Sequence, residues 1–304
     1  MSLEKIAISI GDINGIGIEL ALKNHHIVKK LANPIYCIDK KLLKKASKKL
    51  NIAIPDDFKI YGKYKKCKIK VAVETKSSGR FSYDSFKTAI DLAVKDEVSA
   101  IVTLPINKKA WELAGIDYVG HTDMLRDVFK KDAIMMLGCS QMYVALFTEH
   151  IPLKDVAKYI KTKRLKKFLS DFFISIDKPN QPIAVLGLNP HAGDNGVLGD
   201  EEKYILKAIE KVNKKYGSKF ELVVPDIAFT PHVRSRYKYF CAMYHDQGLA
   251  PLKALYFDQS INVSLNLPIK RTSVDHGTAY DLAYKKNNNI SNLSYLNAIK
   301  EAVI

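Results

Sequence analysis

The stretch KIAISIGDINGIGIE, at residues 5–19, decides how the chain begins to fold. Its first six residues are mostly apolar and rich in isoleucine, which is typical of a buried strand. A glycine-rich turn follows at 11–17, and an amphipathic helix is predicted from about Glu19. Strand, tight turn and helix in this order are the opening of an α/β unit.

The same alternation continues to the end of the chain. Further strands are predicted at 34–39, 68–74, 100–104, 141–148, 182–188, 221–225, 239–244 and 261–265. Further helices are predicted at 41–51, 83–95, 153–159, 164–176, 201–215, 278–285 and 293–303, with a loop at 77–79. Strands that alternate with helices predict an α/β protein with a largely parallel sheet. The 304 residues suit two domains or one large α/β unit, and no linker-like stretch marks a border, so a discontinuous domain is compatible with the sequence.

The charge balance is basic, with 48 Lys and Arg against 32 Asp and Glu and a formal net charge of +16. Basic proteins bind nucleic acid, membrane surfaces or small anions. The lysines are spread along the chain, and those at 44, 45, 48 and 49 fall at helical spacing, which predicts a solvated helix face. No zinc-finger spacing or RNA-binding motif accompanies them, which argues against a nucleic-acid partner and favours an anionic small molecule.

The four cysteines, Cys37, Cys67, Cys139 and Cys241, are far apart and form no CxxC pair. They are predicted to be mostly buried free thiols in a reducing compartment. The apolar run near the N-terminus is too short for a signal peptide, and no stretch of about 18 apolar residues suggests a membrane span. We therefore expect a cytoplasmic protein without a membrane partner.

Polar clusters follow the predicted strands. They are Gly11-Asp12 and the segments 105–108, 148–150, 189–191, 245–248 and 271–276. In open α/β sheets, ligands bind outside the carboxyl ends of the strands, so these clusters are candidates for one active site. The turn at 11–17 is not a GxGxxG fingerprint, and the chain contains no GxxxxGK[ST] or GxSxG motif.

Five of the eight histidines lie in such polar segments: His121, His150, His191, His245 and His276. Any one of them alone is more often a structural residue than a ligand. Three neutral imidazoles leave open positions on a divalent metal for water or substrate, which is the usual pattern of a catalytic site. The spacings are long, so the residues by themselves do not say which three would form it.

Several charged residues near these histidines have two interpretations. Asp246 and Asp275 could orient an imidazole or move a proton, or they could simply cap a helix or turn. Lys108, Lys253 and Arg271 could hold a phosphate or carboxylate, or could be ordinary surface charges. Arg271 follows an apolar strand and precedes Thr272-Ser273, which favours the anion-binding interpretation.

Seven stretches together resemble one family, 4-hydroxythreonine-4-phosphate dehydrogenase of the pyridoxal phosphate pathway. They are GDINGIGIE at 11–19, TLPINKKA at 103–110, GHTDML at 120–125, TEHIPL at 148–153, LNPHAGDNGVLGDEE at 188–202, AMYHDQGLAPLK at 242–253 and NVSLNLPIKRTSVDHGTAYDLA at 262–283. They occur in the family's order over nearly the whole chain. The first motif departs from the family's usual GDPAGIGPE at Ile13, Asn14 and Ile18, and Asn266 stands where a glycine is usual.

The resemblance implies an α/β fold like that of isocitrate and isopropylmalate dehydrogenases, with two α/β domains and an active-site cleft between them. The expected first domain comprises residues 1–125 with 262–304, and the second comprises 126–261 with metal-binding and dimer-interface segments. The family is similar in forming a homodimer with a shared active site, so a homodimer is expected here.

The resemblance also implies roles for individual residues. The expected metal ligands are His150, His191 and His245. The expected substrate contacts are His121, Thr122, Lys253, Asn262 and Arg271. His276 falls outside both sets. Asp246 is the candidate general base.

The implied reaction is oxidation of 4-phosphooxy-L-threonine with NAD or NADP and one divalent metal ion, which is Zn, Mg or Co. The β-keto acid product decarboxylates to 3-amino-2-oxopropyl phosphate on the way to pyridoxine 5'-phosphate. One alternative is a related dehydrogenase of another phosphorylated hydroxy acid on the same scaffold. A remote alternative is a basic, non-catalytic nucleic-acid-binding protein, whose binding would weaken steeply with salt.

Overall fold

We describe a computed structural model that covers residues 3–286 and 288–304. The chain divides into two compact units. Unit 1 comprises Met1–Lys130 and Leu267–Ile304, and unit 2 is Lys131–Asn266. Each border lies about five residues beyond the one expected from the sequence, so the strand that contains Asn262 belongs to unit 2 and not to the first domain.

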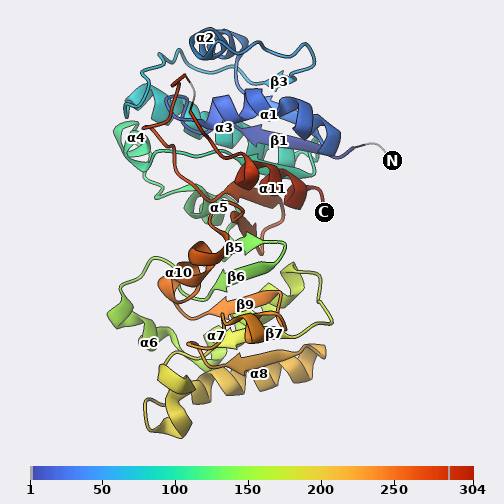
Figure 1. The fold of residues 1–304 in the computed structure, drawn as a ribbon, viewed down its shortest axis with the longest axis vertical. Helices are drawn as coiled ribbons and strands as arrows, with labels where there is room; N and C mark the ends of the chain where they lie inside the picture. Colours follow the sequence, from blue (N-terminus) through green and yellow to red (C-terminus); the bar gives the residue numbers. More distant parts are fainter. Residues whose placement is uncertain (1–2, 287) are drawn as a thin grey trace. The chain divides into compact units, whose positions relative to one another are not determined.

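Unit 1 is built on a parallel sheet with the strand order β3-β2-β1-β4-β11. Figure 1 labels two of these strands, β1 and β3. Its strands are β1 (Lys5–Ser9), β2 (Asn33–Cys37), β3 (Ile60–Tyr61), β4 (Ala100–Thr103) and β11 (Lys270–Val274). Its helices are α1 (Gly17–Leu31), α2 (Lys40–Leu50), α3 (Lys76–Val94), α4 (Lys108–Leu113), α5 (His121–Phe129) and α11 (Leu293–Ala302). β11 thus pairs with β4 although it comes more than 160 residues later in the chain.

Helices cover both faces of this sheet. On one face, Phe86 of α3 packs with Ala7 of β1 and Ile101 of β4. Successive side chains of a strand point to opposite faces, so Ile6 and Ile8 lie on the other face. There α1 packs against β2, and α11 packs against β4 and β11. Burial on both faces explains why these strands are continuous apolar runs.

Unit 2 contains a mixed sheet with the strand order β10-β5-β6-β9-β7-β8. Its strands are β5 (Ile134–Cys139), β6 (Met142–Leu146), β7 (Ile183–Leu186), β8 (Phe220–Val223), β9 (Tyr239–Ala242) and β10 (Ile261–Leu265). Its helices are η1 (Leu153–Asp155), α6 (Val156–Tyr159), α7 (Thr162–Ser175), η2 (Pro190–Gly196), α8 (Glu202–Tyr216), α9 (Pro231–Arg234) and α10 (His245–Tyr256). β10, β5 and β6 pair antiparallel, and the other pairs are parallel.

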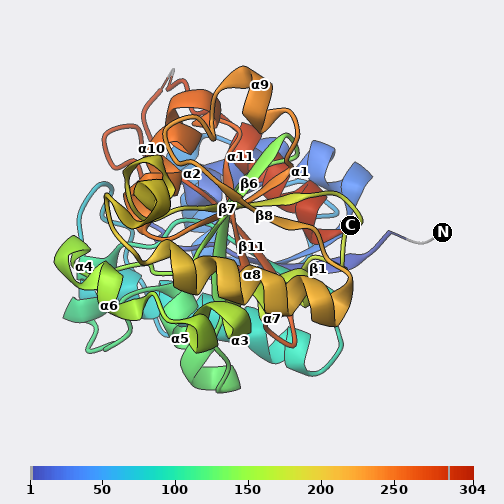
Figure 2. The same cartoon turned by 90° about the horizontal axis from the view of Figure 1, so that it is seen from below.

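The two faces of this sheet are covered by different helices. Leu249 and Leu252 of α10 pack with Phe240 of β9. On the opposite face, Phe172 of α7 makes an edge-to-face contact with Tyr239, with ring centroids 6.0 Å apart. α7 in turn lies beside α8, as Figures 1 and 2 both show. The predicted α/β architecture with a largely parallel sheet is therefore confirmed.

The strand predicted at 68–74 is wrong, because the chain between β3 and α3 is irregular. The Asn14 side chain takes the hydrogen bonds that a strand partner would have taken. Its Oδ1 accepts from the backbone N of Lys70 (2.9 Å), and its Nδ2 donates to the carbonyl of Val73 (2.7 Å). Alternating apolar residues therefore run beside the turn that follows β1, without pairing with another strand.

Two helix predictions also differ from the structure. The helix predicted from residue 83 begins at Lys76, so the loop predicted at 77–79 is helical. Thr75 caps it by accepting from the N of Ser78 (3.0 Å), and Gly79 allows α4 to approach, since a Cβ there would lie 1.8 Å from the Ala110 carbonyl oxygen. The helix predicted at 278–285 is instead a series of turns, in which Ala279 and Tyr284 have φ values of 43° and 57°.

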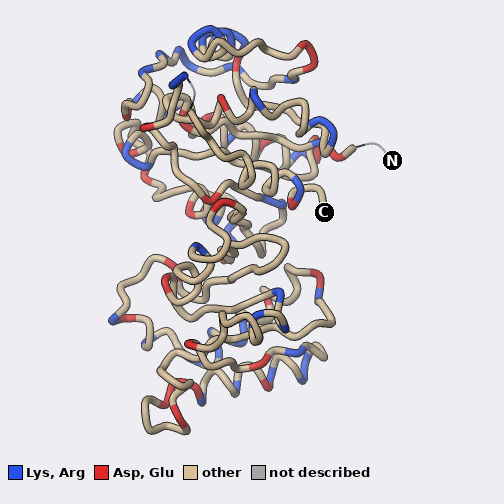
Figure 3. The backbone as a smooth tube through the Cα atoms, viewed as in Figure 1, with Lys and Arg blue, Asp and Glu red and all other residues tan. Residues whose placement is uncertain are grey.

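The positions of the lysines and the state of the cysteines agree with the predictions from the sequence. Figure 3 shows Lys and Arg distributed over both units, and the predicted solvated face of α2 carries exposed lysines while Leu42, Leu43 and Ala46 are buried. All four cysteines are buried and free. Among the described residues, no helix combines the length and the apolar character that a membrane span requires.

Candidate functional site

Three neighbouring strands of unit 2 each lead into a segment with one predicted metal ligand. β9 pairs in parallel with β6 on one side and with β7 on the other. His150 comes four residues after the end of β6, His245 three after β9, and His191 five after β7. Because parallel strands share one carboxyl edge, the three segments that carry these histidines all leave the sheet at that edge.

His150 and His245 are brought side by side. Their ring centroids are 5.7 Å apart, and the rings are tilted by 41°. The pairing of β6 with β9 continues beyond the strands, where the hydroxyl of Thr148 donates to the carbonyl of Met243 (2.6 Å). This extension carries the two loops together up to the histidines.

Asp246 contacts the imidazole of His245, with 2.6 Å between Nδ1 of His245 and Oδ1 of Asp246. A carboxylate on Nδ1 fixes the tautomer in which Nδ1 carries the proton, so Nε2 is left with a lone pair. The geometry therefore does not support the two interpretations of Asp246 equally. The contact favours the orienting role, and both residues lie in the first turn of α10.

His191 lies in η2, a segment with an unusual backbone. It has a φ of 51°, and Ala192, Asp194 and Asn195 also have positive φ values of 53°, 43° and 55°. Each non-glycine residue in the left-handed region costs about 1–2 kcal/mol. Consecutive residues in this region persist only when surrounding contacts hold them.

Glu202, in the first turn of α8, holds the residues just before this segment. Its Oε1 accepts from the backbone N of Leu188 and of Asn189, both at 2.8 Å, and its Oε2 accepts from Nδ2 of Asn189 at 2.9 Å. The side chain is 6% exposed. Gly193 is also required, because a Cβ there would lie 2.7 Å from Oε2 of Glu202. Glu202 thus anchors the chain that leads into His191.

Gln247 connects the ends of two of the three strands. Its Oε1 accepts from the N of Met243 (2.7 Å), and its Nε2 donates to the carbonyl of Gly187 (2.6 Å). Gly248 lets α10 approach β6, since a Cβ there would lie 2.4 Å from a methyl group of Val144. In the segment HDQG at 245–248, His245 and Asp246 therefore lie at the edge of the sheet, while Gln247 and Gly248 position α10.

The side chains at this edge are of types that bind divalent metal ions. His150 and His245 lie side by side, and Asp246 contacts Nδ1 of His245, so Nε2 is not used by that contact. His191 lies on the adjoining loop. Among residues 3–286 and 288–304, no three His, Cys, Asp or Glu side chains are gathered into a metal-binding group.

A second group of predicted site residues lies in unit 1. Arg271 is the second residue of β11 and is 2% exposed. Its Nε and one terminal nitrogen donate to the hydroxyl of Thr103 at 3.1 and 2.6 Å. Burial lowers the pKa of Arg271 to about 9. His121 begins α5 and packs edge-to-face on Phe86 at 4.5 Å. Its buried Nε2 has no hydrogen-bond partner among the described residues.

Burial, and then the positive charge of Arg271, lowers the pKa of His121 well below its ordinary value. His121 is therefore neutral at pH 7 and can offer an N–H or a lone pair. An orphaned buried nitrogen next to a buried cation is an arrangement that a bound anion would complete.

The titration of His121 predicts how stability depends on pH. The unfolded chain binds a proton at this residue below about pH 6.5, while the folded chain does not, because the folded pKa is depressed. The contribution of His121 to the free energy of unfolding is therefore present above about pH 6.5. It is lost as the pH falls toward the folded pKa, at up to about 1.4 kcal/mol per pH unit.

The check is urea unfolding of the native protein and of His121→Gln between about pH 7 and pH 5. The free energy of unfolding of the native protein is expected to fall more steeply with decreasing pH than that of the variant. Parallel pH profiles for the two proteins would contradict the prediction.

The other predicted contacts are dispersed over the two units. Thr122 follows His121 in α5 and is buried. Lys253 lies on α10 with Nζ 5.6 Å from the ring centre of Phe257. Asn262 lies in β10, and its buried Oδ1 has no hydrogen-bond partner within the described part of the chain. His276, outside the expected set, has Nδ1 3.0 Å from the carbonyl of Gly277.

Asp12 is a buried carboxyl group that the sequence placed in a candidate polar cluster without an individual role. Burial raises its pKa, and hydrogen bonds from the Asn14 N, the Tyr280 hydroxyl and the Ser78 hydroxyl oppose that shift. These bonds join the turn after β1 to α3 and to the segment after β11. Asp12 therefore organises the carboxyl edge of the unit 1 sheet.

A model of the family described as pyridoxal phosphate biosynthetic protein PdxA matches residues 30–302. The chain belongs to the PdxA family. The family predicted from the seven motifs is thereby confirmed.

Relatives of this PdxA chain match it over its whole length. The 4-hydroxythreonine-4-phosphate dehydrogenase of Sulfurimonas denitrificans is 60% identical over 305 residues, which cover 100% of this chain and 98% of that protein. The enzyme of the same name from Campylobacter fetus is 52% identical over 306 residues, with the same coverage.

Several solved structures are similar to this chain. A 4-hydroxythreonine-4-phosphate dehydrogenase from Klebsiella pneumoniae has a TM-score of 0.82 at 28% identity, covering 99% of this chain and 97% of that one. A terephthalate 1,2-cis-dihydrodiol dehydrogenase from Burkholderia xenovorans has a TM-score of 0.70 at 19% identity, covering 99% of this chain and 97% of that one, and shares the fold.

Glu202 and Gln247 were missed by reasoning from the sequence of this PdxA chain. Glu202 bonds residues 13 and 14 positions away, and Gln247 bonds Gly187, which lies 60 positions away, so no local pattern marks these contacts. Glu202 stood at the start of a predicted helix, where an acidic residue is expected for the helix dipole alone.

Replacing Glu202 by alanine is expected to lower the free energy of unfolding by about 2–4 kcal/mol, because two backbone N–H groups lose their acceptor. Urea unfolding measures this change. Glu210→Ala, on an exposed position of the same helix, is the control and should cost less than about 0.5 kcal/mol. Equal stability of the two variants would exclude the anchoring role.

Proposed function

We propose that the chain is an NAD(P)-dependent 4-hydroxythreonine-4-phosphate dehydrogenase. It would oxidise 4-phosphooxy-L-threonine to a β-keto acid that decarboxylates to 3-amino-2-oxopropyl phosphate, in pyridoxine 5'-phosphate biosynthesis. The observation that carries the proposal is the 60% identity over the full chain to a relative with this activity in its name. The adjacent imidazoles of His150 and His245 support it independently.

His150, His191 and His245 are the proposed ligands of one divalent metal ion. When bound, the ion would supply a Lewis acid for the hydroxyl group that is oxidised. Of the three ions expected from the resemblance, Zn²⁺ and Co²⁺ suit imidazole nitrogens better than Mg²⁺, which prefers oxygen ligands. Asp246 holds the His245 imidazole by its Nδ1, and it remains our candidate for the general base.

The proposed contacts of the phosphorylated substrate are five residues, each described within its own unit. His121, Thr122 and Arg271 belong to unit 1, and Lys253 and Asn262 to unit 2. Arg271 offers a positive charge in a water-poor environment, where a charge-assisted hydrogen bond to phosphate is strong. Neutral His121 can donate from its orphaned Nε2, and the buried Oδ1 of Asn262 can accept from a substrate N–H or O–H group.

The remaining parts of the proposal are a homodimer with a shared active site, NAD or NADP as the oxidant and a cytoplasmic location. They are supported by the family resemblance, and the location also by the four free thiols. Sedimentation analysis of the purified chain measures its oligomeric state directly.

The deciding experiment is the reduction of NAD⁺ and NADP⁺, followed by absorbance, with 4-phosphooxy-L-threonine as substrate. Turnover is expected with metal-loaded protein and should disappear with a chelator. No turnover by metal-loaded protein would exclude the proposed reaction, and turnover that a chelator does not affect would exclude the metal role. Faster turnover of another phosphorylated hydroxy acid in the same assay would favour the related dehydrogenase.

A further inference from the structure

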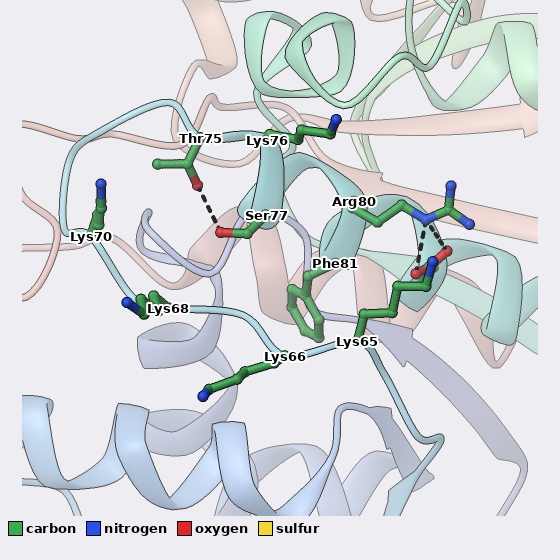
Figure 4. A pocket seen from close by; sticks show the side chains of 10 residues that line it. Lys65, Lys66, Lys68, Lys70, Thr75, Lys76, Ser77, Arg80 and Phe81 are labelled. Atoms are coloured by element: carbon green, nitrogen blue, oxygen red, sulfur yellow. Dashed lines mark hydrogen bonds and ion pairs between the residues drawn. The ribbon is translucent and has the colours of Figure 1, made fainter.

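A basic cavity of about 550 Å³ lies in unit 1, and none of the residues that line it is a predicted site residue. Its walls are the irregular segment before α3 and the first turns of α3 (Figure 4). The cations that line it are Lys65, Lys66, Lys68, Lys70, Lys76 and Arg80. The sequence had placed four of these lysines in or beside a strand, so their gathering around a cavity was not expected.

The charges of the basic cavity are poorly compensated. Arg80 bonds Asp84, with 3.1 Å between Nε and Oδ2. Within the described residues, none of the five lysines has a carboxylate partner. Like charges held together raise the free energy of the folded chain, and a bound anion lowers it again.

Uncharged groups of α3 add to the attraction for an anion. The helix has 19 residues, and its own first turn contains no acidic residue that would offset the positive end of its dipole, although the buried Asp12 accepts from the Ser78 hydroxyl at this end. The hydroxyls of Thr75 and Ser77 lie 3.3 Å apart at this end. Figure 4 shows Ser77 and Phe81 pointing from α3 toward the segment that carries Lys66 and Lys68.

Both walls of the basic cavity are attached to the turn that follows β1. Asn14 in this turn bonds the N of Lys70 at 2.9 Å, and Asp12 accepts from the hydroxyl of Ser78 at 3.3 Å. The cavity is therefore held beside the carboxyl edge of the unit 1 sheet, which is where α/β proteins bind their ligands. Its lysines belong to a segment that the core fixes in place.

We propose that the basic cavity binds an anion that carries a diphosphate or triphosphate group. The volume lies within the range of about 300–1,000 Å³ that is usual for small-molecule sites. Six cations opposed by one carboxylate exceed what a single phosphate can neutralise, whereas a diphosphate or triphosphate brings several negative charges into the same space. This proposal does not depend on the proposed enzymatic function.

The test is calorimetric titration of the full chain with sodium tripolyphosphate. The native protein is expected to bind it, and to bind orthophosphate at least about tenfold more weakly. A triple variant, Lys66→Gln with Lys68→Gln and Lys70→Gln, should weaken tripolyphosphate binding by about tenfold or more, since each lost ion pair contributes a modest amount. All three side chains are exposed, so the fold should tolerate the changes.

The matched control is a second triple variant, Lys207→Gln with Lys211→Gln and Lys214→Gln. These three exposed lysines lie on α8 in unit 2, and their removal changes the net charge by the same amount. This control should bind tripolyphosphate within about twofold of the native protein. Equal weakening in both variants, or no binding by the native protein, would overturn the proposal.

Competition distinguishes two sources of the polyphosphate. If NADP⁺ or NAD⁺ displaces tripolyphosphate from the native protein, the basic cavity holds the phosphates of the nicotinamide cofactor. If neither displaces it, the ligand is a separate polyphosphate anion. Both results come from binding alone, so they hold even if the chain fails to oxidise 4-phosphooxy-L-threonine.

Discussion

Replacing His245 by alanine is expected to lower kcat/KM for 4-phosphooxy-L-threonine by about 10³-fold, because a metal Lewis acid contributes several kcal/mol to the transition state. The same variant should bind fewer equivalents of Zn²⁺ or Co²⁺ at equilibrium dialysis. The reason lies in the geometry, since His245 faces His150 with 5.7 Å between ring centroids and has its Nδ1 held by Asp246.

The control for this substitution is His232→Ala. His232 is an exposed histidine of unit 2 in the short helix α9, and the sequence assigns it no role. It should leave both kcat/KM and metal content unchanged within about twofold. If His245→Ala retains full metal content and activity, the metal role of His245 is wrong. Asp246→Asn should lower kcat/KM by about 10- to 100-fold if Asp246 only orients the His245 imidazole, and by up to about 10⁴-fold if it is also the general base.

Replacing Arg271 by methionine is expected to raise KM for the phosphorylated substrate by about 10²-fold or more. A buried guanidinium that makes two charge-assisted hydrogen bonds to phosphate contributes about 3 kcal/mol or more. Methionine preserves most of the side-chain volume at a position that is 2% exposed, so the variant should fold. Steady-state kinetics with 4-phosphooxy-L-threonine measures the change.

Lys270→Met is the matched control, since it removes the same charge from the adjacent residue of β11. Side chains alternate along a strand, so Lys270 points to the opposite face from Arg271 and should leave KM within about twofold. Equal effects of the two substitutions would show that the net charge matters and not the buried position. Unchanged KM in Arg271→Met would remove this residue from the substrate site.

Much of the fold could be predicted from local patterns. The stretch at 5–19 predicts β1, the glycine turn and α1, and the structure contains all three. Periodic apolar residues likewise predict α2, α7 and α8. These elements are regular because their own side chains cover one face or both faces with apolar groups.

Two of the errors arose where a distant part of the chain decided the local structure. The apolar alternation at 68–74 resembles a strand, yet Asn14 takes its backbone hydrogen bonds. The serines and glycine at 77–79 resemble a loop, yet Gly79 is the helical residue that lets α4 approach α3. In both cases the partner lies more than 30 residues away, beyond the reach of any local pattern.

The candidate site likewise has residues that the sequence predicted and residues whose roles only the tertiary structure shows. The motifs named His150, His191 and His245 through the family resemblance, and the parallel pairing of β6, β9 and β7 places all three after neighbouring strands. The roles of Glu202 and Gln247 appear only in the tertiary structure, because their partners come from other elements.

The sequence by itself determined the α/β class, the family and the candidate chemistry, because strand runs, helix periods and long motifs are local properties of the chain. Only the tertiary structure decided which side chains meet. It buried Arg271 beside His121, set His150 against His245, and folded the lysines at 65–70 around a cavity. The opening turn at 11–17 shows both contributions, since its glycines predicted the fold while Asp12 and Asn14 hold segments that the sequence places far away.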